Sequence, residues 1–587
     1  MSVERLITDN IDVWTSTVKT KSASGRGSSK KRELYGIKKL RELILELAVR
    51  GKLVPQDSTD EPASVLLERI AEEKAQLVKE KKIKKSKPPS KIANEDEPFI
   101  LPQGWAWSRL GNAGIGATGK TPSTKQTEFF EGTLPFIGPG QITQNGQLLE
   151  AEKFLSSEGL LHSTEAVQGD ILMVCIGGSI GKAAIATQTI GFNQQINALR
   201  PLIMESDYLY AAVSTNSFYE GLLDKATGSA TPIINRGKWE ELLVPIAPLS
   251  EQHRIVAKVD ELMTLCDQLE QQSEASIEAH QVLVTTLLDT LTNSADADEL
   301  MQNWARISEH FDTLFTTEAS IDQLKQTILQ LAVMGKLVPQ DSTDEPAAKL
   351  LERIAEEKAQ LVKEKKIKKQ KALPPITEDE KPFELPKGWK WCRFEDVVEI
   401  QSGITKGRKL AGRELKTIPY LSVANVQRGY LNLQNVKEID LPVDELEKYA
   451  VEAGDLLITE GGDWDKVGRT AIWRTEAPYM AHQNHVFKAR PYLSEQSEIW
   501  LEMYLNGPFA RDYFAGSSKQ TTNLASINKT QLRGCLIAVP PDNEKKYIVR
   551  KVGELMAFCD QLKARLKESQ KTQLHLTDAI VEQAVLL

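Results

Sequence analysis

The sequence predicts an α+β protein in which two unlike α+β domains are separated and flanked by copies of the same helical segments. Residues 47–85 and 331–369 are identical at 36 of 39 positions without a gap. Residues 256–269 (VAKVDELMTLCDQL) also resemble residues 549–562 (VRKVGELMAFCDQL). The segments between these repeats differ from each other. Because 587 residues are too many for one hydrophobic core, the sequence indicates several domains.

The order of the repeats predicts a pseudo-two-fold molecule. We name the first repeat A and the second repeat B. Their copies are offset by 284 and 293 positions, so the two intervening segments differ in length by nine residues. The chain runs A, variable segment, B, A, variable segment, B. The B–A junction would occur a second time if the C-terminus lay beside the N-terminus, which predicts a circularly closed arrangement.

Repeat A predicts two helices. Ile37, Leu40, Ile44 and Leu47 follow helical spacing, and Gly51 suits the left-handed position after that helix. Pro62 suits the first turn of the second helix. The apolar side of the second helix consists of Leu66, Leu67, Ile70 and Leu77. We expect this helix to end in "KEKKIKKSKPP", where two prolines stop it.

Repeat B predicts one long helix, which over residues 253–291 would span about 60 Å. A helix of this length most simply packs against its own copy as an antiparallel two-helix coiled-coil spacer. We predict Cys266 and Cys559 as small core residues. The predicted interface positions follow a heptad-like seam and are Val259, Leu262, Cys266, Leu269, Val552, Leu555, Cys559 and Leu562.

The variable segments predict short strands and loops. Residues 169–186 and 454–473 have short apolar runs split by glycines, and helix is expected after Tyr208 and after Glu498. The predicted regions are 1–100 (repeat A), 101–250 (first α+β domain), 251–384 (repeats B and A), 385–541 (second α+β domain) and 542–587 (repeat B).

The motifs do not identify a catalytic centre. Gly114–Thr121 (GIGATGKT) satisfies the P-loop pattern, but a weakly apolar stretch precedes it and turn residues follow it, where a phosphate loop needs a buried strand and a helix. A polar loop is the favoured interpretation, and an ATPase remains an alternative. His482 and His485 form an HxxH without a third metal ligand at suitable spacing. No glycine-rich signature for S-adenosylmethionine is found.

Composition limits the partners. The net charge of −8 gives no global nucleic-acid signature, so any such surface must be local or shared with a partner. Lysine-rich runs at 74–91 and 358–371 are either solvated helix ends or patches that contact phosphates or subunits. The five scattered cysteines suit a reducing cytoplasm. No apolar run is long enough for a membrane span, and the N-terminus does not resemble a signal peptide.

The order of these segments resembles the specificity subunits of type I restriction-modification enzymes. "LPxGWxW" opens each variable segment, at 101–107 and 385–391. "GKTPSTKQTEFFEGTLPFIGPGQI", "GDIL…IGKAAIA…FNQQINALRP" and "IAPLSEQHRIVAKVDEL" are similar to the family's opening, middle and exit. The sequence "LAVRGKLVPQDSTDEPA" is similar to that of one subgroup of the family, whose members carry repeat A at the N-terminus and again in the centre. One departure is Asn543-Glu544-Lys545-Lys546, where the first copy has Ser250-Glu251-Gln252-His253.

The resemblance implies a non-catalytic, cytoplasmic bacterial subunit. Each variable segment would be a target recognition domain for one half of a bipartite, asymmetric double-stranded DNA sequence. The helices would set the gap between the halves and bind two modification subunits. Those subunits would supply adenine-N6 methyltransferase activity with S-adenosylmethionine, and restriction subunits would add ATP- and Mg-dependent translocation and cleavage. This chain itself would bind no cofactor and no metal.

Polar side chains on loops are the candidate base-contacting residues. In the first domain they are Lys120, Thr121, Ser123, Lys125, Gln194, Gln195, Ser229, Thr231 and Asn235. In the second domain they are Lys406, Arg408, Lys409, Asn425, Arg428, His482, Gln483, Lys519, Gln520 and Thr521. Two other classes of function stay open at this point: an enzyme, either an ATPase around Lys120 or a fused modification enzyme, and a coiled-coil scaffold without DNA contact.

Overall fold

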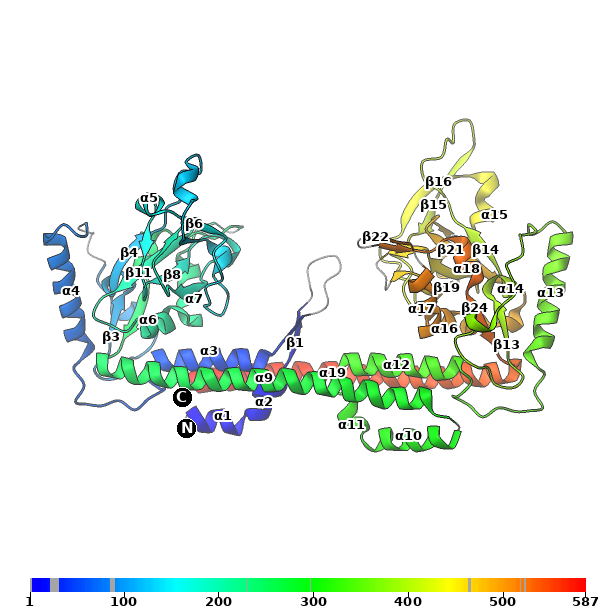
Figure 1. The fold of residues 1–587 in the computed structure, drawn as a ribbon, viewed down its shortest axis with the longest axis horizontal. Coiled ribbons are helices and arrows are strands. Elements are labelled where there is room, and N and C mark those ends of the chain that lie inside the picture. Colours follow the sequence, from blue (N-terminus) through cyan, green and yellow to red (C-terminus); the bar gives the residue numbers. More distant parts are fainter. Residues whose placement is uncertain are drawn as a thin grey trace. The chain divides into compact units, whose positions relative to one another are not determined.

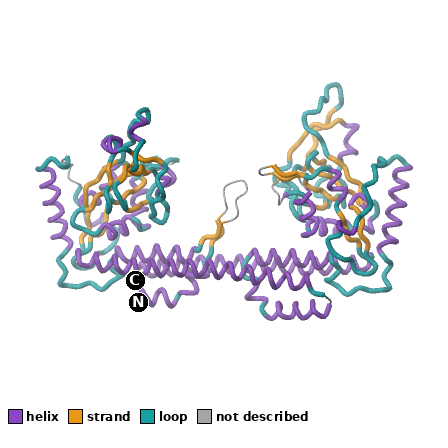
Figure 2. The backbone as a smooth tube through the Cα atoms, viewed as in Figure 1, coloured by secondary structure: helices purple, strands orange, loops and turns teal. Residues whose placement is uncertain are grey.

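The computed structural model describes residues 3–21, 31–84, 90–228, 230–295, 297–462, 466–517, 519–521 and 524–586. The chain divides into two compact units. Unit 1 comprises Met1–Lys21, Lys31–Ala275 and Gln570–Leu587, and unit 2 comprises Ser276–Ser569. Within each unit, the strands other than β1 and β2 gather in one α+β body, and the repeats supply helices beside it (Figure 1, Figure 2). The predicted α+β class with long helices is confirmed.

Unit 1 contains both chain ends. Its helices are α1 (Val3–Asp9), α2 (Ile11–Ser16), α3 (Tyr35–Val49), α4 (Ala63–Lys79), α5 (Ser157–Leu161), α6 (Ser206–Val213), α7 (Asn216–Lys225), α8 (Arg236–Glu240) and the first part of α9 (Leu249–Asn293). Its strands are β1 (Lys19–Lys21), β2 (Lys31–Glu33), β3 (Ala106–Arg109), β4 (Gly114–Thr118), β5 (Leu134–Ile137), β6 (Lys153–Leu155), β7 (Glu165–Ala166), β8 (Ile171–Val174), β9 (Ala183–Ile185), β10 (Ile190–Phe192), β11 (Ile196–Pro201) and β12 (Leu243–Ile246).

Unit 2 follows the same plan. Its helices are α10 (Ala297–Glu309), α11 (Phe311–Leu314), α12 (Glu318–Val333), α13 (Ala347–Lys363), α14 (Phe394–Val397), α15 (Leu446–Tyr449), α16 (Glu498–Asn506), α17 (Pro508–Ser517), α18 (Lys529–Gly534) and the first part of α19 (Asp542–Leu586). Its strands are β13 (Lys390–Arg393), β14 (Val398–Ser402), β15 (Leu415–Leu421), β16 (Lys437–Pro442), β17 (Leu456–Thr459), β18 (Gly461–Gly462), β19 (Thr470–Ile472), β20 (Ala481–His482), β21 (Val486–Pro491), β22 (Lys519–Thr521), β23 (Leu524–Ser526) and β24 (Leu536–Val539).

The two α+β bodies share one sheet topology although their sequences differ. The order β4-β11-β8-β9 in unit 1 corresponds to β14-β21-β17-β19 in unit 2. In each body the first strand pairs with the last, β3 with β12 and β13 with β24, so the chain enters and leaves at the same place. A second sheet contains β5, β6 and β10 in unit 1 and β15, β16 and β20 in unit 2.

The helices of repeat A form as predicted, except at one end. Ile37, Leu40, Ile44 and Leu47 are all buried on α3, and Gly51 follows it with φ +64°. Helix α4 does not continue to the prolines, and it ends at Lys79 because the chain turns there. Lys81 adopts φ +60°, and the N–H of Lys82 bonds back to the carbonyl of Leu77, which is the closing bond of a Schellman turn.

Repeat B forms two helices of equal length. Helices α9 and α19 each have 45 residues, which corresponds to about 67 Å at 1.5 Å per residue. In unit 1, Leu262 of α9 packs in one core with Ala584 of α19. In unit 2, Leu288 of α9 packs in one core with Val552 of α19. The beginning of each helix therefore meets the end of the other, which confirms the antiparallel pairing.

Repeat A adds a third helix to each of these pairs. Helix α3 shares the core of unit 1, and α12 shares the core of unit 2. Arg41 of α3 binds Asp267 and Glu270 of α9 at 2.7 Å, and Lys325 of α12 binds Asp560 at the equivalent place on α19. Within each unit, a third helix from repeat A therefore packs against the predicted antiparallel pair.

The predicted seam residues face these intramolecular cores. Leu262, Cys266, Val552 and Cys559 are buried, and Val259, Leu269, Leu555 and Leu562 are partly buried against the same clusters. Burial raises the pKa of the Cys266 thiol to about 11. Both thiols therefore behave as small core groups, as the sequence predicts.

The chain ends meet inside unit 1. Thr577 of α19 donates to the hydroxyl of Thr17 at 3.1 Å, and Tyr35 donates to Asp578 at 2.7 Å. Lys52, just after α3, donates to the carbonyl of Val585 at 2.9 Å. The C-terminal copy of repeat B therefore packs against the N-terminal copy of repeat A, which is the closure that the repeat order predicts.

Candidate nucleic-acid interface

A tryptophan–glutamate hydrogen bond closes each α+β body at its entrance. Trp105 of "LPQGWAW" donates its indole N–H to Glu251 at the start of α9, at 2.9 Å. Trp389 of "LPKGWKW" donates in the same way to Glu544 of α19, also at 2.9 Å. The opening motif of each variable segment therefore binds its exit motif. Both motifs therefore hold the body on the repeated helices.

A second pair of contacts stabilises each central sheet. Arg200 on β11 forms hydrogen bonds to both oxygens of Asp170, at 2.9–3.3 Å. Arg490 on β21 binds both oxygens of Asp455 at 2.7 and 2.8 Å. The Asp455 side chain is only 1 % exposed, so this fork of donors, together with the N–H of Glu452 at 2.7 Å, satisfies a buried carboxylate.

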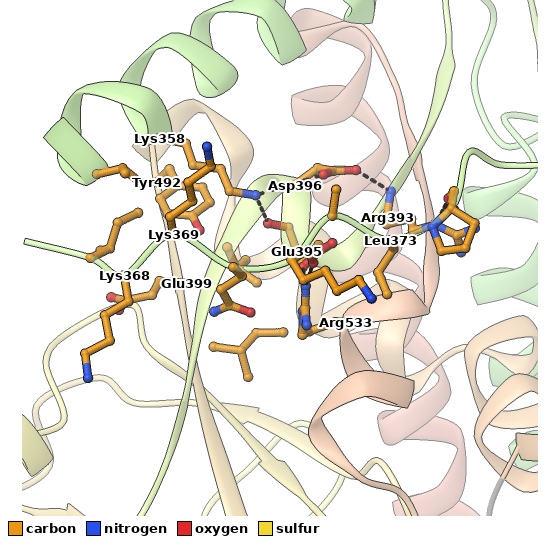
Figure 3. Close-up of a pocket in the computed structure, with 18 of the residues that line it drawn as sticks. Lys358, Lys368, Lys369, Leu373, Arg393, Glu395, Asp396, Glu399, Tyr492 and Arg533 are labelled. Carbon is orange, nitrogen blue, oxygen red and sulfur yellow. Dashed lines mark hydrogen bonds and ion pairs between the residues drawn. The ribbon is translucent and has the colours of Figure 1, made fainter.

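The lysine-rich runs begin with a structural lysine. Lys74 of α4 donates to the carbonyls of Gly111 and Gly114 in the first body. Lys358 of α13 donates to the carbonyl of Glu395 at 2.8 Å. The chain after α13 then lines a pocket of about 420 Å³ with Lys368, Lys369 and Arg533 (Figure 3). The first lysine of each run therefore positions the helix on its own domain.

Several candidate residues of the first domain lie together where the loop at residues 119–121 packs against the turn at residues 192–195. We call this place the crossing. The backbone N–H of Lys120 donates to the carbonyl of Phe192 at 3.0 Å, and Thr121 donates to the side chain of Gln194 at 2.8 Å. Lys120 and Gln194 are exposed, and Gln195 is half-buried. The structure thus brings four predicted residues from two distant segments into one polar edge beside strands β4 and β10.

This crossing requires glycine. A Cβ atom on Gly119 would lie 1.9 Å from the carbonyl oxygen of Asn193. In the second domain, a Cβ atom on Gly403 would lie 2.2 Å from the carbonyl oxygen of His482. The N–H of Ile404 donates to the same carbonyl at 2.8 Å. The glycine of the P-loop-like pattern is therefore explained by close packing of two backbone segments.

The P-loop interpretation is wrong for this stretch. Gly114–Thr118 forms strand β4, which pairs with β11, so these residues cannot wrap around a phosphate. No helix begins after Lys120, and the next element in the chain is a single 3₁₀ turn at Thr127–Phe130. The described residues also contain no cluster of three or more His, Cys, Asp or Glu side chains that could hold a metal ion.

Two predicted base-contacting residues are buried and must be corrected. Asn425 is 2 % exposed, and its side chain bonds to Ser422, Asn432 and Asn435 within its own loop. His482 is fully buried, and burial lowers its pKa to about 4, so it is neutral at pH 7. One ring nitrogen of His482 contacts the carbonyl of Val486 at 2.7 Å. Both residues shape the loops and cannot contact bases from these positions.

The other candidates have varied surroundings. Ser123, Lys125, Thr231 and Lys409 are exposed, and Gln483 is half-buried beside the crossing. The Asn235 side chain caps α8, and the Lys406 ammonium lies 5.1 Å from the Tyr420 ring. Arg408 binds Glu445 at 2.8 Å, and Arg428 lines a pocket with Gln326 and Arg511. Lys519, Gln520 and Thr521 form strand β22, and Ser229 lies outside the described residues.

Two residues at the second crossing were missed. Arg200 and Arg490 occupy equivalent positions on strands β11 and β21. Aligning the two domains on these arginines matches Gln194 and Gln195 with Asn484 and His485. His485 is exposed and contacts Glu460 at 2.6 Å. The "RP" dipeptide at the end of both strands could have provided this alignment. The prediction of His482 and Gln483 is two residues too early in it.

Comparison with known proteins places these features in one family. The family model for the type I restriction modification DNA specificity domain matches residues 102–279 and 386–570. The specificity subunit of the Escherichia coli type I restriction enzyme EcoAI is 44% identical over the full length of both chains, and that of EcoEI is 42% identical over the same extent. The EcoKI subunit is 20% identical over 82% of this chain and 89% of its own.

Two solved structures were also aligned with the chain, both at TM-scores below 0.5. A chain from a type I R-M system structure is 17% identical, covers 83% of this chain and 99% of its own, and has a TM-score of 0.49. The HsdS subunit of Thermoanaerobacter tengcongensis is 17% identical over 83% of this chain, with a TM-score of 0.38. No helix in the described part of the chain has both the length and the apolarity of a membrane span.

Proposed function

Because the chain belongs to the family of type I restriction enzyme specificity subunits, we propose that it selects the DNA sequence for a type I restriction-modification complex without catalysing a reaction itself. Each α+β body would act as a target recognition domain and contact one half of a bipartite, asymmetric DNA target. The crossings at Gly119 and Gly403 would present the contacting side chains to the base edges.

One observation supports this division most strongly. The tryptophan–glutamate contacts that hold the two bodies on the helices are the same in both units, whereas the side chains at the two crossings differ. Trp105 and Trp389 make the same hydrogen bond, but the exposed Lys120 and Gln194 of the first crossing correspond to the buried Ile404 and the half-buried Asn484 of the second. Recognition of two unlike half-sites needs unlike surfaces, while attachment to one scaffold needs identical ones.

The repeated helices would have two roles. Helices α9 and α19 each extend over about 67 Å, and one turn of B-DNA is about 34–36 Å, so helices of this length are adequate to set the gap between half-sites. The two copies of repeat A would each bind one modification subunit. S-adenosylmethionine, ATP and Mg would then belong to the modification and restriction subunits, in the bacterial cytoplasm.

A domain exchange tests the proposal. Residues 101–250 are replaced by the corresponding segment of another family member, and the methylated motif is determined by methylome sequencing of cells that carry the complete system. We expect one half of the motif to change and the other to stay. A change in both halves, or in neither, would refute the assignment.

The chain supplies a matched control. Replacing residues 47–85 by the sequence of 331–369 changes only Arg50→Met, Ser64→Ala and Val65→Lys. These positions belong to the repeated scaffold, so this exchange should leave both halves of the motif unchanged.

A further inference from the structure

The lysine-rich segment at the end of α13 is a concentration of positive charge on an acidic chain. Residues 363–371 (KEKKIKKQK) contain six lysines and one acidic residue, whereas the whole chain has a net charge of −8. All six lysines are exposed. Lys366 pairs with Glu364 at 2.8 Å, and within the described residues the other five lysines pair with no carboxylate. We call residues 363–371 the lysine strip.

The end of the helix does not account for these charges. Lysines stabilise the negative end of a helix dipole only within about the last turn. Helix α13 ends at Lys363. Lys368, Lys369 and Lys371 follow in a segment without regular structure, five or more residues beyond that end. These three lysines therefore require another explanation.

The strip is held against the second body through its backbone. Lys365 adopts φ +58° and turns the chain away from the axis of α13. Arg533 donates to the carbonyl of Lys371 at 2.6 Å. Just beyond the strip, Arg393 donates to the carbonyl of Pro374 at 3.0 Å. These bonds fix the path of the segment and do not use the lysine ammonium groups.

Two carboxylates of the neighbouring pocket already have cationic partners. Arg533 binds Glu395, and Lys358 lies 4.0 Å from Asp396. Figure 3 shows Lys368 pointing away from both of these carboxylates. The Lys368 ammonium is therefore available to an external anion.

The strip lies near the crossing of the second body. Lys368 and Lys369 line the same pocket as Ile400 of β14, and β14 leads directly to Gly403. At about 3.3 Å per residue, Gly403 lies within about 10 Å of Ile400. The major groove of B-DNA is about 12 Å wide. Phosphates that border base edges contacted at the crossing would therefore come within reach of the strip.

The composition of the strip favours DNA over a protein partner. Ile367 is its only apolar residue, and it is half-buried in the pocket. Stable protein interfaces have an apolar or aromatic centre and are depleted in lysine. Phosphate oxygens are a common target of lysine side chains, and such contacts carry no sequence information. The first six residues of the strip recur unchanged at 79–84, before a domain of different sequence, as a sequence-independent contact requires.

We propose that the lysine strip binds the DNA phosphate backbone beside the half-site that the second body contacts. This inference rests on the proposed function, because it requires that the second body binds DNA. The strip would strengthen binding to target and unrelated duplexes alike and would leave the recognised sequence unchanged.

The salt dependence of binding tests the strip. The full chain, co-expressed with its modification subunits, is titrated with a labelled duplex that carries the methylated motif and with an unrelated duplex, between about 50 and 200 mM KCl. The test variant combines Lys365→Gln, Lys368→Gln, Lys369→Gln and Lys371→Gln. Each phosphate contact contributes about 0.9 to the slope of log K against log salt, so the loss of about two to four contacts should reduce the slope by about 1.8 to 3.6 on both duplexes.

Two further variants separate this contact from structure and from general charge. Replacing the same four lysines by arginine keeps the charge and should keep the slope. A matched control replaces four other lysines of unit 2 by glutamine, all at least 50 % exposed: Lys349, Lys546, Lys551 and Lys567. It should also keep the slope. An unchanged slope in the test variant, or an equal loss in the arginine or the control variant, would overturn the proposal.

Neutral phosphates locate the contact and distinguish DNA from a protein partner. The domain exchange described above identifies the half of the motif that the second body contacts. Methylphosphonate linkages beside that half should weaken binding of the unsubstituted complex and have little further effect on the test variant. Equal weakening of both complexes would overturn the proposal. Loss of the modification subunits from the test variant with an unchanged slope would assign the strip to those subunits and would also overturn it.

The experiment separates failure of the strip from failure of the proposed function. If the unsubstituted complex does not prefer the motif duplex over the unrelated one, the proposed function fails. If it does prefer the motif and the test variant keeps the full slope, only the strip fails.

Discussion

Glu544 should make the stability of unit 2 depend on pH near neutrality. Its side chain accepts the Trp389 indole N–H on one oxygen, while the other oxygen is buried without a hydrogen-bond partner. Burial, more than any other factor, raises the pKa of Glu544 from 4.5 to about 7. In unit 1 burial also raises the pKa of the equivalent Glu251, but there a hydrogen bond from Gln56 at 3.2 Å and the positive charge of Arg254 oppose the rise.

The sign and size of the effect follow from proton binding. Between pH 4.5 and 7 the folded chain keeps the proton that the unfolded chain releases, so stability is lost as pH rises through this window. One pKa unit corresponds to about 1.36 kcal/mol, so the loss reaches at most about 3 kcal/mol by pH 8. Glu544→Gln keeps an acceptor for Trp389 and carries no charge. It should therefore stabilise unit 2 by about 1–3 kcal/mol at pH 8 and have little effect at pH 4.5.

Hydrogen exchange measured by mass spectrometry can follow each unit separately. Protection of β13 and β24, corrected for the intrinsic pH dependence of exchange, reports unit 2, while β3 and β12 serve as the internal reference. Tyr547→Arg should also reduce the pH dependence, because Tyr547 occupies the position of Arg254. Equal pH profiles for the unmodified chain and Glu544→Gln would refute the reasoning.

Two further predictions concern the recognition bodies. Gly119→Ala should displace the crossing loop, since its Cβ would lie 1.9 Å from the carbonyl oxygen of Asn193. A clash of about 1.4 kcal/mol corresponds to a loss of at least about tenfold in affinity for the motif duplex. As a control, Gly140→Ala should bind normally, because the added Cβ would meet no atom within 4 Å. Arg490→Ala should leave the buried Asp455 carboxylate with the N–H of Glu452 but without its positively charged partner, and destabilise unit 2 by about 3 kcal/mol in thermal unfolding. A loss below about 1 kcal/mol would contradict this role.

The repeats made most of the helical scaffold predictable, because identical sequences are expected to adopt the same structure. The burial of Ile37, Leu40 and Ile44, the left-handed Gly51 and the antiparallel long helices all follow from periodicity and copy number. The end of α4 was mispredicted because the Lys81 turn, and not a proline, terminates the helix. Lysine rarely adopts positive φ, so residue type gives no signal for this turn.

The candidate site was predictable only in part, because polarity does not determine burial. Lys120, Thr121, Gln194 and Gln195 are polar residues in two separate segments, and the structure joins them. His482 is also a polar residue, but it lies in strand β20, and the parallel pairing of β20 with β15 places it in the core. Strand pairing between distant segments decides which side of a loop faces water, and a single sequence does not record it.

The hydrogen bonds that hold each body explain how its sequence can differ while its attachment stays the same. Lys74 and Lys358 of the repeated helices donate to backbone carbonyls of the bodies. Arg109 and Arg393 of the bodies donate in turn to the backbone carbonyls of Ser90 and Pro374 in the connecting segments. A carbonyl is present whatever side chain its residue carries. The repeated segments can therefore attach to bodies of unlike sequence, provided that the backbone path is kept. This predicts that exchanges of whole bodies are tolerated, whereas Lys74→Ala or Lys358→Ala should weaken the attachment of any body placed beside that helix.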